Sequence, residues 1–206
     1  MWPEFGVKSS PIPAGPWGRL ALTKVPEDWP LAALGLDMNP ERTKVTIGVA
    51  ARSTQGVHLE VAEDAPFTED GTDALVKWIF ERAKRRIPIV IDAFSPIRSI
   101  EPALKQKGCK VFILNAHELS QACGGLYDAV MKDKSVTHFG QDVLDASLAG
   151  TVKQKFGDGG AWKWNRKGLD TDLTPIMSVT AAHFGAVKFA KQPRADGAEK
   201  RKTVIL

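Results

Sequence analysis

Two short apolar runs that each end in an aspartate constrain the fold of this chain most. The runs are LAALGLD at residues 31–37 and IPIVID at residues 87–92. Both have the length of a strand, and the second stays apolar until Asp92, as expected for a strand covered on both faces. An ionised carboxylate at the end of a buried strand is costly unless it is paired, hydrogen-bonded or bound to a metal. The fold must therefore compensate the charges of Asp37 and Asp92.

The segments around these runs predict an α/β fold with a mixed β-sheet. Three antiparallel strands form a meander, an acidic loop follows at residues 63–70, and later strands are joined through helices. The predicted strands are residues 31–38, 44–51, 57–61, 87–94, 109–114 and 161–165. The predicted helices are residues 73–86, 117–132, 141–152 and 174–188, with another opened by Ser95-Pro96 and stopped by Gly108. Parallel crossover strands beside the meander would complete a sheet flanked by helices.

The ends of the chain differ from its middle. Residues 1–30 are rich in Pro and Trp and predict a linker or arm, residues 31–190 predict one domain, and residues 191–206 predict a basic tail. The net charge of +4 does not by itself indicate a nucleic-acid partner, because six basic and two acidic residues from Lys188 onward account for all of it. Two cysteines without a CxxC pair favour a reducing compartment, and no apolar run approaches the roughly 20 residues that span a bilayer.

The two strand-end aspartates predict a metal site. The first strand of the meander and the first crossover strand are expected to be neighbours, so Asp37 and Asp92 would emerge at the same end of the sheet. Adjacent carboxylates repel one another, and a divalent cation stabilises them; carboxylate-only sites favour Mg²⁺ or Mn²⁺. Asp170 and Asp172, just before the last helix, are the candidates for a third acid. Asp172 is alternatively the N-cap of that helix, the commoner role for such a residue.

Basic residues near the Gly-rich turn at residues 157–160 are candidates for DNA contacts. They lie close in sequence to the third acid, and a solvated polar face is the equally good alternative interpretation. The candidates are Lys153, Lys155, Lys163, Arg166 and Lys167. His138 is expected in a turn and His183 on the apolar face of the last helix, so neither is predicted to act in catalysis.

Four segments carry a resemblance to a known family: LGLDMNPERTKVTIGVA, IPIVIDAFSPI, the stretch from THFGQDVLDASLAG to GGAWKWNRK, and DTDLTPIMSVTAAHFGA. Together they resemble the ribonuclease H-like superfamily, and more narrowly the nuclease domain of the large terminase subunit of tailed bacteriophages. The resemblance implies an endonuclease that cleaves duplex DNA by two-metal-ion hydrolysis during genome packaging. It implies Asp37, Asp92 and Asp172 as ligands of two Mg²⁺ or Mn²⁺ ions, with Asp170 as an alternative ligand.

The resemblance also implies partners and a location. The expected partners are double-stranded DNA, an ATPase motor domain, the portal and the small terminase subunit, with no membrane, in the cytoplasm of an infected bacterial host. The sequence has no GxxxxGK[ST] phosphate loop, so the motor is expected on a preceding segment or a separate chain. Two other functions stay open: another ribonuclease H-like nuclease such as a junction resolvase, and a non-catalytic module that docks on DNA or the portal.

Overall fold

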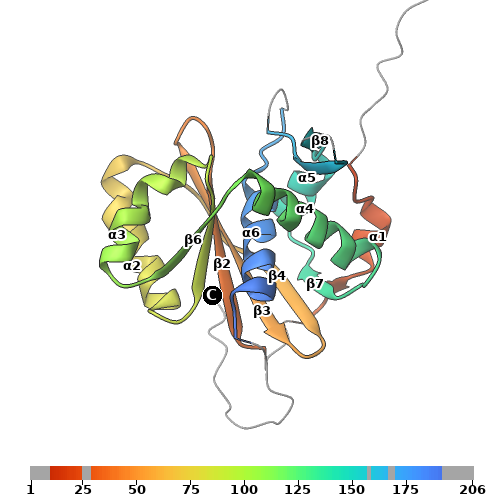
Figure 1. Ribbon diagram of the computed structural model, residues 1–206, viewed down its shortest axis with the longest axis horizontal. Coiled ribbons are helices and arrows are strands. Elements are labelled where there is room, and N and C mark those ends of the chain that lie inside the picture. Colours follow the sequence, from red (N-terminus) through yellow and green to blue (C-terminus); the bar gives the residue numbers. More distant parts are fainter. Residues whose placement is uncertain (1–9, 25–28, 157–158, 167–169, 192–206) are drawn as a thin grey trace, which may run out of the picture.

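A mixed sheet forms the centre of the molecule (Figure 1). The computed structural model describes residues 10–24, 29–156, 159–166 and 170–191, and in this part of the chain the main sheet has seven strands. The strands of the main sheet are β1 (Ala21–Leu22), β2 (Leu31–Met38), β3 (Lys44–Ser53), β4 (Gly56–Pro66), β5 (Pro88–Asp92), β6 (Lys110–Leu114) and β7 (Val136–Phe139). A separate hairpin consists of β8 (Lys153–Phe156) and β9 (Ala161–Trp164).

The order of strands across the sheet is β1-β7-β4-β3-β2-β5-β6. The meander β2-β3-β4 is antiparallel, whereas β5 and β6 run parallel to β2 at one edge and β7 runs parallel to β4 at the other. The predicted α/β class, with three antiparallel strands plus parallel crossover strands, is confirmed. The predicted neighbourhood of the two acid-ending strands is confirmed as well, since β2 pairs directly with β5.

Helices cover both faces of the sheet (Figure 1). The helices are α1 (Ala14–Gly18), α2 (Thr72–Ala83), α3 (Glu101–Gln106), α4 (Ala116–Met131), α5 (Asp142–Ala149) and α6 (Thr174–Lys188), with 3-10 turns η1 (Glu69–Gly71) and η2 (Pro96–Ile100). Alternate residues of β2 point to opposite faces of the sheet. Leu34 and Leu36 pack against the face covered by α2 and α3, and Ala33 packs against the face covered by α6. Asp37 shares the parity of Ala33, so its side chain belongs to the α6 face.

Two glycines let α6 approach the sheet closely. A Cβ atom added to Gly48 would lie 2.6 Å from backbone atoms of Ser178 and Val179, and one added to Gly35 would collide with the Ser178 carbonyl. Because the helix backbone rests directly on β2 and β3, the start of α6 is held at the end of the sheet where Asp37 lies.

Several local predictions differ from the structure. The described part of the predicted linker or arm packs on the domain: Trp17 is buried and stacks on His138, with ring centroids 3.7 Å apart, and β1 extends the sheet edge beside β7. His138 accordingly lies in β7 rather than in a turn. The helix expected after Ser95 is divided into η2 and α3, since Pro102 stands in the first turn of α3. The basic tail from residue 192 lies outside the described residues.

Among the helices of the described residues, none combines the length and the apolar character needed to cross a membrane.

Candidate active site

The ends of β2 and β5 bring two buried carboxylates together. Leu36 pairs with Ile91 in the parallel register, so the next residues along the strands, Asp37 and Asp92, are neighbours at the same end. Asp37 is 1% exposed and Asp92 is 3% exposed. The predicted position of both acids, at the same end of neighbouring strands, is confirmed. Their burial makes a compensating charge necessary.

That compensating charge comes from Arg166, which follows the β8–β9 hairpin. Its Nη1 donates to Asp37 Oδ2 at 2.9 Å, and its Nη2 donates to Asp37 Oδ1 at 2.9 Å and to Asp92 Oδ2 at 3.2 Å. We refer to Asp37, Asp92 and Arg166 as the inner cluster. Arg166 was a candidate for DNA contact, whereas in the structure its guanidinium points between the two acids.

Burial and charge pairing oppose one another in the inner cluster. Burial raises the pKa of Asp37 above its ordinary value, although the Arg166 guanidinium and the Ser95 hydroxyl oppose the shift. Burial also works against the charge of Arg166, but the two carboxylates prevail and raise its pKa. The guanidinium therefore stays charged, and the cluster of two carboxylates and one guanidinium has a formal charge of −1 when both acids are ionised.

A second group of charges lies farther along the same end of the sheet. Lys44 Nζ contacts Asp64 Oδ2 at 2.7 Å and Asp172 Oδ2 at 2.8 Å. We refer to Asp64, Asp172 and Lys44 as the outer cluster. Its side chains are more exposed, at 18% for Asp64, 38% for Asp172 and 30% for Lys44.

Thr46 stands between the two clusters. It is opposite Asp37 on β2 and opposite Asp64 on β4 in the antiparallel registers. Its hydroxyl donates to Asp64 Oδ1 at 2.6 Å and lies 2.8 Å from the Thr174 hydroxyl. Since strands are spaced about 4.8 Å apart, Asp64 is displaced by two strands, about 10 Å, from Asp37.

Asp172 stands two residues before Thr174 and accepts hydrogen bonds at the start of α6, although the N-cap residue of that helix is Leu173 rather than Asp172. Its Oδ1 accepts hydrogen bonds from the backbone N–H and the hydroxyl of Thr174, at 2.8 Å each, which satisfies a donor at the start of α6. Its Oδ2 pairs with Lys44 rather than with the inner cluster. Partial burial opposes ionisation, but Lys44 and Thr174 together lower the pKa of Asp172, so this carboxylate is ionised at neutral pH.

The structure does not bring the predicted three acids into one group. Among the described residues, no set of three or more His, Cys, Asp or Glu side chains is positioned to hold a metal ion. Asp170 is exposed, and Asp172 is held beside Asp64 by Lys44. The donor chemistry of Asp37 and Asp92 nevertheless fits a hard divalent cation, because two adjacent buried carboxylates offer oxygen ligands and excess negative charge.

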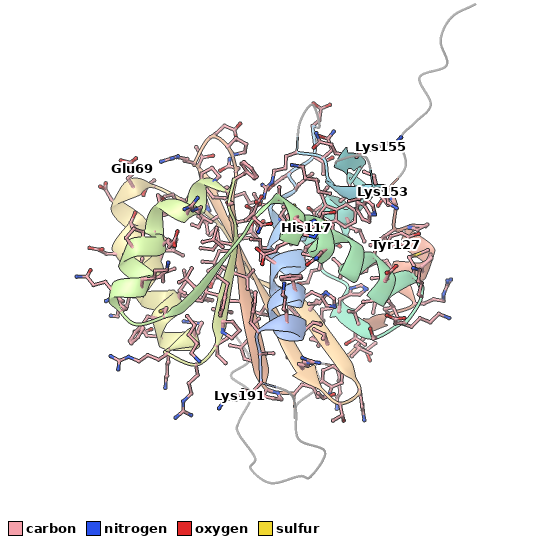
Figure 2. All side chains as sticks on the ribbon, in the orientation of Figure 1. Glu69, His117, Tyr127, Lys153, Lys155 and Lys191 are labelled. Carbon is pink, nitrogen blue, oxygen red and sulfur yellow. The ribbon has the colours of Figure 1, made fainter. Side chains whose placement is uncertain are left out.

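Two of the residues predicted to contact DNA, Lys153 and Lys155, lie on strand β8 of the hairpin. Lys155 is exposed on β8, and Lys153 Nζ lies 4.3 Å from the ring centroids of both Tyr127 and Trp162; Figure 2 labels both lysines. Lys163 is on β9, with its Nζ 5.5 Å from the Phe94 ring centroid. Lys167 lies outside the described residues.

His183 does not belong to either cluster. It lies on α6 and is 6% exposed, and burial, reinforced by Arg52, lowers its pKa to about 4. The imidazole is therefore neutral at pH 7, in line with the core position predicted from the helical spacing.

Three features of the two clusters were not predicted from the sequence: Lys44, Asp64 and the pairing of Arg166 with the acids. The sequence predicts an acidic loop at Asp64, but β4 continues to Pro66. A bulge opposite Ile47 and Gly48 changes the alternation there, which puts Asp64 rather than Glu63 in register with Thr46. A β-bulge has no signal in this local sequence that would have revealed it.

The architecture and the acid positions define the ribonuclease H-like class of fold: a mixed sheet with an antiparallel meander and aspartates at the ends of adjacent parallel strands. Within this class, solved nucleases of large terminases have the same fold. The large terminase nuclease of thermophilic phage G20c with bound magnesium is similar with a TM-score of 0.62 and 16% identity, over 85% of this chain and 96% of that one. The same nuclease with bound cobalt gives a TM-score of 0.60 at 17% identity, over 85% of this chain and 96% of that one.

Longer proteins contain the fold too. The large terminase of bacteriophage HK97 is similar with a TM-score of 0.60 and 13% identity, over 86% of this chain but only 43% of the HK97 protein. No protein-family model matches the sequence, and no curated protein does. At such low identity the likeness establishes the fold, and function must be argued from the site.

Proposed function

We propose that this chain is the nuclease domain of a phage large terminase, which cleaves duplex DNA by metal-dependent hydrolysis during genome packaging. The observation that carries the proposal is the pair of buried carboxylates, Asp37 and Asp92, at the ends of adjacent parallel strands. Two buried acids side by side are unfavourable for stability, and such arrangements concentrate at functional sites. Support comes from the fold, since the G20c nuclease was solved with magnesium and with cobalt bound.

In this proposal Asp37 and Asp92 hold divalent cations, Mg²⁺ or Mn²⁺, through their carboxylate oxygens. A bound divalent ion supplies a water of lowered pKa as nucleophile and neutralises charge on the leaving oxygen, and two such ions can divide these tasks. Asp172, which lies in the outer cluster in this structure, is proposed as the third carboxylate, with Asp170 as its alternative. Lys44 and Thr174 contribute by keeping Asp172 ionised and fixed at the start of α6.

The lysines of the hairpin are proposed to bind the DNA backbone. Lys155 is exposed, and Lys153 and Lys163 carry further positive charge on the same hairpin. Contacts to phosphates orient the duplex without reading its sequence, so cleavage is expected to have little sequence preference. An ATPase motor, the portal and a small subunit are the proposed protein partners, as the family resemblance implies.

A plasmid assay tests the proposal. Supercoiled DNA is incubated with the protein in Mg²⁺, Mn²⁺ or EDTA, beside Asp92→Asn and the matched control Asp133→Asn, which changes an exposed acid. We expect nicking and linearisation that require the metal, and a loss of at least about a hundredfold in Asp92→Asn, the scale on which one group that stabilises a transition state acts. Asp133→Asn is expected to cut like the unmodified protein.

Cutting that continues in EDTA, or an Asp92→Asn protein as active as the control, would exclude the proposed mechanism. Absence of cutting with retained DNA binding would favour the docking module. A strong preference for four-way junctions over plasmid would favour a junction resolvase.

A further inference from the structure

Arg166 has unusual surroundings for a surface-loop arginine. Its side chain is 24% exposed, and its two terminal nitrogens make three hydrogen bonds to Asp37 and Asp92. Its Nε, in contrast, is buried and has no hydrogen-bond partner among the described residues. A buried donor left unsatisfied costs free energy, and the charged hydrogen bonds to Asp37 and Asp92 offset that cost.

The guanidinium meets the same electrostatic need as a divalent ion would. Two buried carboxylates on neighbouring strands require a positive charge, and Arg166 supplies +1 through the same oxygen atoms that a cation would use. A carboxylate oxygen that accepts a short charged hydrogen bond from Arg166 is a poorer metal ligand until that bond breaks. The guanidinium and a divalent ion therefore compete for these oxygens, and they also repel one another by charge.

The backbone around Arg166 favours an exchange that involves only its side chain. Trp164 is 1% exposed in the core, and the Asn165 N–H donates to the Val152 carbonyl at 2.8 Å, so the chain is anchored just before Arg166. The arginine side chain has several rotatable bonds and a partly exposed guanidinium. Rotation toward solvent would free both carboxylates without moving the hairpin.

We propose that Arg166 is a built-in counter-ion that competes with divalent metal for Asp37 and Asp92 and so sets the metal affinity of the site. The inference rests on the proposed function, since it assumes that these acids bind metal. It assigns Arg166 as a positioning residue: the arginine stabilises the acid pair before metal binds and must leave when metal enters.

Substitutions of Arg166 distinguish this role from a purely structural one. Arg166→Gln removes the competing charge and should bind Mn²⁺ and Mg²⁺ at least about tenfold more tightly, the lower end of the range over which groups around metal ligands alter affinity. Arg166→Lys should be intermediate, because a single ammonium cannot form the fork that spans both carboxylates. A merely structural arginine would give weaker binding in both variants, since its loss would loosen the site.

Isothermal titration calorimetry with Mn²⁺ and with Mg²⁺ measures these affinities. Lys107→Gln is the control that removes one positive charge; Lys107 is exposed at the end of α3, beside the start of β6 and so at the opposite end of the sheet from the acids. Its affinity should equal that of the unmodified protein. Asp92→Asn should abolish binding in every background.

A second measurement uses the unmodified protein and does not depend on how the variants fold. The Nε–H resonance of Arg166, assigned by NMR, should move toward the value of a solvent-exposed arginine as Mg²⁺ is added. Arg166→Lys retains a positive charge in the acid pair and is the variant whose folding is least at risk.

The outcomes separate the inference from the proposed function. If metal binds and Asp92→Asn abolishes binding, but both Arg166 variants bind equally or more weakly and the Nε–H resonance stays in place, the inference is wrong and the metal site stands. If no protein of the series binds either metal, both the inference and the proposed function fail.

Discussion

The inner and outer clusters contain the same groups, two aspartates and one basic side chain, yet burial makes them physically different. The aspartate side chains of the inner cluster are 2% and 5% exposed, whereas those of the outer cluster are 18% and 38% exposed. In the inner cluster, charges interact in a medium of low dielectric constant and removal of one partner leaves a charge without water. In the outer cluster, water and salt screen the same interactions.

The contrast shows that the number of ion pairs in a protein says little about what each pair does. The outer cluster fixes Asp172 at the start of α6, and because its side chains are exposed, little free energy is needed to desolvate its charges. The inner cluster gathers two desolvated carboxylates, an arrangement that an apolar pair would improve if stability were its purpose. Three measurements test this contrast between the inner and outer clusters, and their expected effects decrease from the first to the third.

The largest effect is expected from Arg166→Gln in metal-free buffer. This change leaves Asp37 and Asp92 buried without their counter-charge, and we expect the free energy of unfolding to fall by about 3–5 kcal/mol. Urea unfolding at pH 7 in EDTA measures it. Adding Asp37→Asn to Arg166→Gln should recover part of the loss, because only one buried carboxylate then remains. A loss below about 1 kcal/mol would place the inner cluster with ordinary surface pairs and end the contrast.

An intermediate effect is expected from Thr46→Val, between the clusters. Valine has nearly the shape of threonine but cannot donate to Asp64 or bond to Thr174, and Thr46 is 0% exposed. We expect a loss of about 1–3 kcal/mol, because buried polar partners lose a hydrogen bond. Thr68→Val, at an exposed position, is the control and should change stability little. Equal stabilities of the two variants would show that the hydrogen bonds of Thr46 to Asp64 and Thr174 contribute little to stability.

The smallest effect is expected in the outer cluster. Lys44→Gln or Asp172→Asn should each lower the free energy of unfolding by no more than about 1 kcal/mol, and less at high salt, since exposure screens the pair. The folded-state pKa of Asp172 is lowered, so its contribution is present above the ordinary value of 3.8 and is lost as the pH falls below that value.

Chemical unfolding of the unmodified protein and Asp172→Asn, compared from pH 7 down to pH 3 at two salt concentrations, tests this expectation. A difference that persists in full at the acid end would mean that the effect of the substitution does not come from the charge of Asp172.

Regular elements with a strong pattern were predicted closely. The strand Leu31–Met38 and the helix Thr174–Lys188 have the predicted bounds, because their apolar residues and the Thr-Pro start are local signals. The short strands β1, β7 and β8 were missed. β1 and β7 become strands by pairing with segments that are distant in sequence, and β8 becomes one by pairing with β9.

In the candidate site, the acids at the strand ends were predictable from the sequence, but their basic partners were not. Asp37 and Asp92 stood out because an acid after an apolar run is costly wherever the run is buried, and their adjacency followed from the order of elements. Asp172 was named from the sequence as a candidate, but its partner Lys44 is 128 residues away, and Arg166 is 129 residues from Asp37. Nothing within a local window reports such pairs.

Local sequence patterns predict the sheet-and-helix class, the two acids that the sheet buries, and the place of the last helix, because alternation, length and capping act through neighbouring residues. Long-range contacts were needed to show which cations compensate those acids, that a bulge turns Asp64 into the outer cluster, and that Trp17 and β1 pack on the domain. These outcomes depend on register and on contacts between distant segments, where burial rather than residue type sets the strength of a charge.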